Sequence, residues 1–252
     1  MQIKYTILSL LLSVSVAQQL QAQPPIPISK TFAIGKDKFR AVSVSPNQIA
    51  LHWKDSQGNA YRSFSALKSD LQKRGKTVIA LMNAGIYTDT DEPAGLHIEN
   101  GQQIKPLNTQ KGKGNFHLRP NGVFFITDKG RAKILPTTHY KKRYGKKNTG
   151  VRLATQSGPM LLVSGKINHR FIKNIKSPYS RNAVCTTKKG QVWFLITDSF
   201  TRTNFYTFAK AAKQLGCHQA LYLDGSISKL YQKEVNSTFH FSHYVGILSV
   251  TE

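Results

Sequence analysis

Two short apolar runs on either side of an amphipathic segment constrain the fold of this chain more than any other feature. Residues Val192–Thr197 and Ala220–Leu223 are almost continuously apolar, as strands covered on both faces are. Between them, apolar residues at helical spacing from Phe205 to Leu215 predict a helix that ends at Gly216. A strand, a helix and a strand of these lengths predict a βαβ crossover, in which the two strands run parallel.

An acidic residue follows each of these two strands. Because parallel strands end at the same edge of a sheet, we expect Asp198 and Asp224 at one rim, where the ligands of such sheets bind. Two carboxylates at one rim divide into an acid and a base when their surroundings separate their pKa values. The alternative is that each merely caps a turn or helix. After Asp224, Gly225 allows close backbone approach, and Ser226 and Ser228 offer hydroxyls to an anionic or sugar ligand.

The rest of the chain predicts further strands and one more helix. We expect two strands between Phe39 and Trp53, a helix over Ser63–Arg74, a buried strand over Thr77–Met82, and hairpins turning at Glu99–Gly101 and Asp128–Gly130. Together with the crossover, these elements predict an α+β fold with a mixed β-sheet and helices packed on it.

The first residues have the layout of a cleaved signal peptide. Lys4 precedes a 13-residue apolar run, Tyr5–Ala17, which is too short to cross a bilayer comfortably, and small and polar residues follow up to Ala22. We therefore expect a signal peptide over residues 1–22, a single domain over residues 23–252, and a periplasmic or secreted location. An uncleaved signal anchor is the alternative. No other segment approaches 18 apolar residues, so no transmembrane segment is expected.

The chain is strongly basic, and export decides what that charge means. It has 36 Lys and Arg against 12 Asp and Glu, a formal net charge of +24. For an exported protein, the expected partners are anionic polymers of the cell envelope, with no specific nucleic acid. The densest basic block, Lys141–Lys147, is typical of a solvated loop, and a dedicated polyanion-binding patch is the alternative.

Metal and thiol chemistry have little support in the sequence. Two cysteines exclude four-cysteine zinc sites and iron–sulfur clusters, and the eight histidines show no metal-ligand pair of the His-Glu-x-x-His kind. We expect no cofactor and no metal, although a single oxygen-bound divalent cation at Asp224 stays open. Cys185 and Cys217 can form a disulfide in an oxidising compartment, and two separate buried thiols are the alternative.

Several blocks resemble, in the same order, the motifs of the phosphodiester glycosidase family. They are Met82–Tyr87, Gly95-Leu96 with Asn100-Gly101, Gln156–Leu161, Ser180–Ala183, Thr197-Asp198 and Leu223–Ser228. The resemblance covers Val78 to Tyr231. The chain departs from the family pattern at Ser199-Phe200, where the family has Gly-Arg, at Asn182, where it has threonine, and after Asp224, where only Gly225 remains of a glycine-rich run.

The resemblance implies an exported hydrolase that breaks a sugar-1-phosphodiester at the anomeric carbon. Phosphate is a good leaving group, so little general-acid help is needed. In this interpretation Asp224 is the base or nucleophile, Asp198 its partner, and Arg181 a bidentate phosphate clamp, the alternative being a surface arginine. The expected substrate-binding residues are Asn83, Gln156, Ser157, Gly158, Gly225, Ser226 and Ser228. A non-catalytic polyanion- or glycan-binding envelope protein is the alternative function.

Overall fold

The computed structural model describes residues 27–145, 147–177, 179–224, 227–233, 235 and 243–252. The expected signal peptide over residues 1–22 lies outside the described residues, as do Gly225 and Ser226. Within the described part of the chain, no helix has both the length and the apolar character that crossing a bilayer requires.

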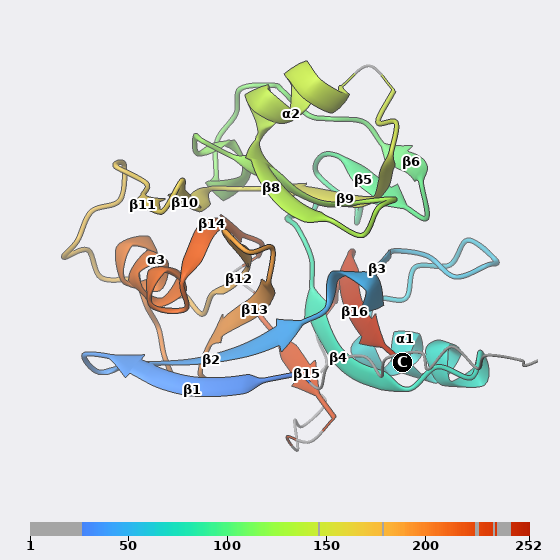
Figure 1. The fold of residues 1–252 in the computed structure, drawn as a ribbon, viewed down its shortest axis with the longest axis horizontal. Helices are drawn as coiled ribbons and strands as arrows, with labels where there is room; N and C mark the ends of the chain where they lie inside the picture. The colour runs from blue at the N-terminus through green and yellow to red at the C-terminus, as the bar shows by residue number, and fades with distance from the viewer. Residues whose placement is uncertain (1–26, 146, 178, 225–226, 234, 236–242) are drawn as a thin grey trace, which may run out of the picture.

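The largest sheet has seven strands and contains both ends of the predicted crossover (Figure 1). Its order is β1 (Ser29–Ile34), β2 (Asp37–Val44), β13 (Val192–Thr197), β12 (Asn182–Thr187), β14 (Cys217–Tyr222), β10 (Met160–Val163) and β11 (Lys166–Ile167). All its neighbouring strands pair antiparallel.

Two smaller sheets complete the β-structure, again with antiparallel pairs only among the described strands. The four-stranded sheet has the order β15 (Leu230–Gln232), β4 (Val78–Asn83), β16 (Ile247–Thr251) and β3 (Ile49–His52). The five-stranded sheet has the order β6 (Gln102–Lys105), β5 (His97–Glu99), β9 (Val151–Ser157), β7 (Gly122–Thr127) and β8 (Ala132–Pro136). Two short 3-10 helices, Pro46–Gln48 and Asn115–His117, lie in connecting segments.

The three sheets enclose one apolar core, and each carries an α-helix on its outer face (Figure 1). Val184, Met82 and Phe124, one from each sheet, belong to the same buried cluster. On the outer faces, α1 (Phe64–Lys73) packs on the four-stranded sheet, α2 (Thr137–Tyr144) on the five-stranded sheet, and α3 (Phe205–Gln214) on the seven-stranded sheet. Strands with one face toward a shared core and the other toward a helix are apolar on both faces, which explains the continuous apolar runs.

The predicted α+β fold and its crossover are confirmed, with one addition. Strands β13 and β14 run parallel and α3 connects them, but β12 lies between them and pairs antiparallel with both. The inserted strand leaves both carboxyl ends at one edge of the sheet, as expected.

One local prediction is wrong. The basic block Lys141–Lys147 was expected to be a loop, but Lys141, Lys142 and Arg143 lie in the last turn of α2. That turn is stabilised by the packing of Tyr140, fully buried, against Phe125 of β7, and cations at a helix C-terminus are favourable.

Candidate functional site

The three sheets converge at one end of the core, and Asn182 is the centre of the convergence. Asn182 is the first residue of β12 and is fully buried. Its side-chain Nδ2 donates to the backbone oxygen and to Oδ1 of Asn83, the last residue of β4, at 2.9 Å each. These two hydrogen bonds join the seven-stranded sheet to the four-stranded sheet.

The same two asparagines hold both ends of the loop that begins at Asp224. The backbone nitrogen of Asp224 donates to Asn182 Oδ1 at 2.9 Å, and that of Lys229 donates to Asn83 Oδ1 at 2.9 Å. Within the loop, the Ser228 hydroxyl donates to the Asp224 backbone oxygen at 2.6 Å. Asp224 therefore stands on a backbone that buried amides fix in place. Asn83 Nδ2 is buried and has no hydrogen-bond partner among the described residues.

Ser157 brings the five-stranded sheet to the same place. It is the last residue of β9, and its hydroxyl donates to the backbone oxygen of Leu223 at 2.8 Å and accepts from the Ile86 nitrogen at 3.4 Å. The chain passes close to β9 here, because a Cβ added at Gly85 would lie 2.5 Å from the Gln156 backbone oxygen. Four residues predicted from the sequence, Asn83, Ser157, Asp224 and Ser228, are thus brought together around Asn182, which was not predicted as a site residue.

Asp198 lies at the same edge as Asp224, as predicted. Ala183 of β12 is the register partner of Leu195 on one side and of Tyr222 on the other, so the two strands extend past it together. The Asp198 carboxylate accepts from the Ser199 nitrogen at 2.8 Å, and its charge opposes the lowering of the Arg40 pKa by burial. Asp198 is exposed at the rim.

Arg181 is buried, which excludes the alternative that it is a surface arginine. Asn182 points into the core between the sheets, and its neighbour Arg181 points to the other face, where the guanidinium carbon lies 3.7 Å from the centroid of the Phe205 ring of α3. Only 4% of the residue is exposed; Nε donates to Thr203 O at 2.8 Å and Nη2 to Ser177 Oγ at 2.9 Å, while Nη1 is buried and has no hydrogen-bond partner among the described residues. Burial lowers the pKa of Arg181.

The contacts of Gln156 and Gly158 within the fold explain why these residue types stand at these positions. Gln156 Oε1 accepts from the backbone nitrogens of Leu96 and Asn108, and Nε2 donates to Asn108 O and Thr137 Oγ1, which uses the full capacity of the amide. A Cβ added at Gly158 would lie 2.7 Å from the Asn121 Cβ, so close packing requires glycine there. The substrate-binding roles predicted for these two residues have no support in their contacts.

Sequence reasoning missed three side chains whose charges interact at this edge of the molecule. Partial burial, and then the positive charge of Arg202, lower the pKa of Lys229. Burial, and then the charge of Asp224, raise the pKa of Tyr87. Tyr87 was noted only as the end of a family-like block, and Arg202 follows the departure from the family pattern at Ser199-Phe200.

Other predicted features fall outside this edge. Cys185 and Cys217 form a disulfide between β12 and β14, with Cα atoms 5.8 Å apart. Across the described residues, no three His, Cys, Asp or Glu side chains gather as metal ligands.

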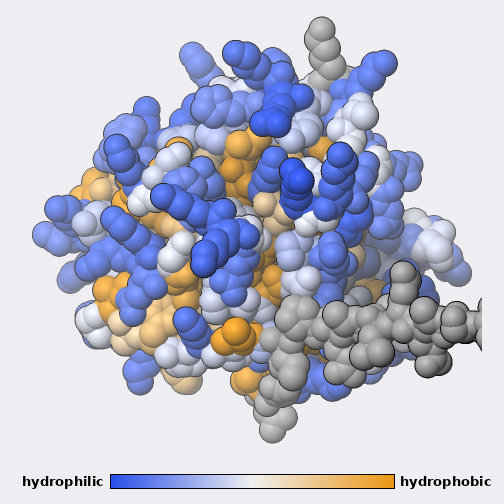
Figure 2. Space-filling view, in the orientation of Figure 1, coloured by the Kyte–Doolittle hydropathy of each residue, from blue (hydrophilic) through white to orange (hydrophobic). Residues whose placement is uncertain are grey.

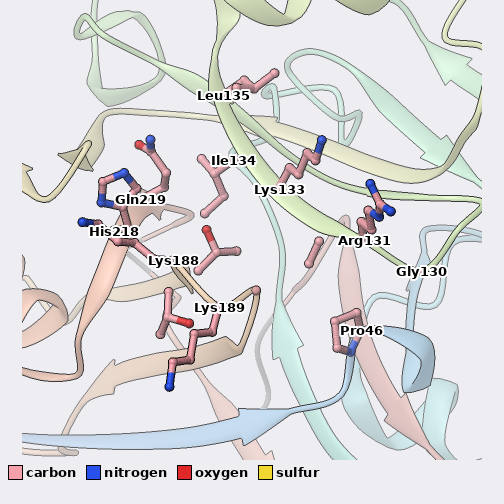
Figure 3. Close-up of a pocket in the computed structure, with 14 residues that line it drawn as sticks. Pro46, Gly130, Arg131, Lys133, Ile134, Leu135, Lys188, Lys189, His218 and Gln219 are labelled. Atoms are coloured by element: carbon pink, nitrogen blue, oxygen red, sulfur yellow. The ribbon is translucent and has the colours of Figure 1, made fainter.

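A basic cavity of about 530 Å³ lies at the opposite end of β12, between β8 and the β12–β13 turn (Figure 3). Its lining includes Arg131, Lys133, Lys188, Lys189 and His218, and no Asp or Glu among the described residues. β12 spans six residues, so this cavity lies roughly 17 Å along the strand from Asn182. It is therefore separate from the convergence of the three sheets.

Comparison with known proteins places this arrangement in a family. The family model described as phosphodiester glycosidase matches residues 76–243, a range that contains Asn83, Asn182 and Asp224. The chain therefore belongs to the phosphodiester glycosidase family. One relative, a protein of Escherichia coli K12 named uncharacterized protein YigE, is 39% identical over 214 residues, covering 84% of this chain and 81% of that protein.

Solved structures share the fold. The catalytic domain of zebrafish N-acetylglucosamine-1-phosphodiester alpha-N-acetylglucosaminidase, auto-inhibited by its pro-peptide, aligns with a TM-score of 0.63 and 13% identity, covering 90% of this chain and 82% of that one. A hypothetical protein from Synechocystis aligns with a TM-score of 0.51 and 12% identity, covering 88% of this chain and 61% of that one. At these identities the likeness is one of fold.

Proposed function

We propose that this protein is an exported hydrolase that cleaves the glycosidic bond of a sugar-1-phosphodiester in envelope or extracellular glycans. The observation that carries the proposal is the anchoring of Asp224, in a family of phosphodiester glycosidases, by Asn182 and Asn83 where three sheets meet. A carboxylate on a backbone held this firmly keeps its position through the reaction, which is what a general base or nucleophile requires.

In this proposal the cations near Asp224 replace Arg181 as the phosphate-binding group. The backbone nitrogen of Lys229 donates to Asn83 Oδ1 at the end of the Asp224 loop, and the charge of Arg202, after burial, lowers the pKa of Lys229. A phosphate group bound by these cations would offset the repulsion between them. In this proposal Arg181 has a structural role, because its Nε donates to Thr203 O and joins the residue before β12 to the segment after Asp198.

The strand order supports a stereochemical prediction. One strand, β12, separates the strands that end at Asp198 and Asp224, so their backbones lie about 10 Å apart. Carboxylates that act together lie about 5 Å apart in retaining glycosidases and roughly 6.5–9.5 Å apart in inverting ones. If Asp198 is the partner of Asp224, we expect inversion, which NMR of the newly released sugar measures directly. A product of retained configuration would exclude Asp198 from this role.

The expected partner is a phosphorylated sugar or glycan, and anionic envelope polymers fit the basic cavity of Figure 3. Four Lys or Arg side chains and no carboxylate line that cavity within the described residues, so it favours polyanions. This cavity is the observation that favours the second candidate function, a non-catalytic polyanion- or glycan-binding protein.

Hydrolysis of a panel of sugar-1-phosphodiesters by the chain from residue 23 onward tests the proposal. We expect turnover that falls by about 100-fold or more in Asp224→Asn and that persists in Asp55→Asn, a carboxylate in an exposed turn. Lys229→Met should raise KM for the phosphodiester more than it lowers kcat. Measuring with and without a chelator decides whether a divalent cation at Asp224 takes part. Absence of turnover together with tight binding of phosphoglycans would establish the binding function instead.

A further inference from the structure

Exposed apolar side chains gather on two neighbouring loops beside the candidate site. Among the described residues, Ile172, Ile175 and Tyr179 of the segment between β11 and β12 are 65%, 52% and 51% exposed, and Phe200 after β13 is 96% exposed. We call these four residues the loop surface. Figure 2 shows orange atoms reaching the surface among blue ones at several places, on the left of the molecule, where α3 lies in Figure 1, and near its centre. A large aromatic side chain left almost entirely in water marks an interaction site when others lie nearby.

Hydrogen bonds join the two loops. The side-chain nitrogen of Asn204 donates to the backbone oxygens of Lys173 and Ile175, at 3.0 and 2.9 Å, and the Thr203 nitrogen donates to Tyr179 O at 3.2 Å. Phe200 is the third residue of a turn closed by the Thr201 nitrogen and Asp198 O at 2.9 Å. The loop surface is therefore continuous with the rim that carries Asp198.

The charged residues within the two segments of the loop surface are cationic, and the carboxylates of Asp198 and Asp37 lie at its border, where Asp37 accepts from the Thr203 hydroxyl at 2.5 Å. Arg170, Lys173, Lys176 and Arg202 lie in the same two segments, 168–181 and 199–204, which contain no Asp or Glu. Apolar side chains that project from a basic surface match the boundary of an anionic bilayer, where apolar groups enter the acyl region and Lys and Arg remain with the headgroups.

We propose that the loop surface docks this protein onto a bilayer that contains anionic lipids. The proposal rests on the proposed function, because docking would hold the rim of Asp198 and Asp224 against the membrane and give it access to sugar phosphodiesters carried by lipids. The occupant is the bilayer surface itself. Docking of this kind requires the apolar side chains of the loop surface. Attraction of a basic protein to an anionic bilayer by charge alone does not require them.

Vesicle sedimentation of the chain from residue 23 onward tests docking. With vesicles of phosphatidylglycerol and phosphatidylcholine, we expect binding that Phe200→Ser combined with Ile175→Ser weakens by about tenfold or more. The matched control is Ile104→Ser on β6, a partly exposed isoleucine far from the loop surface in the fold, and it should bind as the unaltered chain does. Quenching of Phe200→Trp by lipids brominated in the acyl chain should place position 200 below the headgroups.

Other outcomes would overturn docking. Equal binding by the double variant and the unaltered chain, with loss only in Lys141→Gln/Lys142→Gln/Arg143→Gln on α2, would assign the association to the charge of α2. A double variant that binds vesicles normally but shows a raised KM for a soluble substrate with an apolar aglycone would assign the loop surface to the substrate. Failure of the proposed function is seen separately, as loss of turnover on soluble sugar-1-phosphodiesters while vesicle binding persists.

Discussion

At the scale of single residues, His52 of β3 is a partly buried group whose protonation opposes folding. Its Nε2 lies 2.8 Å from the Ser249 hydroxyl of β16, and burial lowers its pKa to about 4, against the opposing charge of Glu99. The unfolded chain has the ordinary value of about 6.5. Above pH 6.5 the residue is neutral in both states, and as pH falls from 6.5 to 4 the unfolded state binds a proton that the folded state does not. We expect the free energy of unfolding to fall by about 3 kcal/mol over this interval on account of His52.

Denaturant titrations at pH 7 and pH 4.5 check this prediction. His52→Gln keeps a hydrogen-bonding group toward Ser249. Its free energy of unfolding should fall less between pH 7 and pH 4.5 than that of the unaltered chain. His169→Gln, at an exposed position, is the control and should leave the pH dependence unchanged. An equal loss in all three proteins would show that His52 does not titrate in this range.

Single residues also show where sequence reasoning stops. Asp198 and Asp224 were placed correctly, because strand ends and chain direction follow from local patterns. The burial of Arg181 against α3 could not be predicted, because neighbouring residues of a strand face opposite sides and the facing elements are not known from sequence. Asn182 was noted only as a departure from the family pattern, and its role depends on Asn83, 99 residues away.

At the scale of elements, one side chain, Asn204, both caps α3 and holds the segment that carries the loop surface. Asn204 Oδ1 accepts from the Thr207 nitrogen at 2.9 Å and caps the helix, while its Nδ2 holds the loop at Lys173 and Ile175. Asn204→Ala removes all three hydrogen bonds and should cost about 2–3 kcal/mol, whereas Asn204→Asp keeps the cap and should cost less. Ser63→Ala, which removes only the cap of α1, should cost about 1 kcal/mol. Denaturant unfolding of the three variants measures these losses in the free energy of unfolding. A loss in Asn204→Ala no larger than that in Ser63→Ala would contradict the prediction.

Most elements could be predicted, since apolar periodicity, caps and turn residues are local signals. Helix α1 ends within one residue of the predicted bounds, and both predicted hairpins are present. Helix α2 could not be predicted, because only Thr137 and Tyr140 of its residues are buried and a basic run gives no helical periodicity. The strand order could not be predicted either, since β2 and β3 follow each other closely in sequence but lie in different sheets.

At the scale of the whole molecule, the disulfide Cys185–Cys217 joins β12 and β14 across 32 residues that include β13 and α3. Closing a loop of this length restricts the unfolded chain, so Cys185→Ala/Cys217→Ala should lower the free energy of unfolding by about 3–4 kcal/mol. Reductant should lower the stability of the unaltered chain by a similar amount and leave the double variant unchanged. A chain indifferent to reductant would show that the two thiols are not joined.

The way the sheets are closed sets the order in which this molecule can be made. β2 pairs with β13, and β16 lies between β3 and β4, so the first and last parts of the chain are neighbours in two sheets. A ribosome releases the chain from one end only, so one edge of β2 stays unpaired until β13 emerges, and β3 and β4 each keep an unpaired edge until β16 emerges. The sheets are therefore completed late in synthesis. Until then the unpaired strand edges can pair with those of other chains unless another molecule covers them.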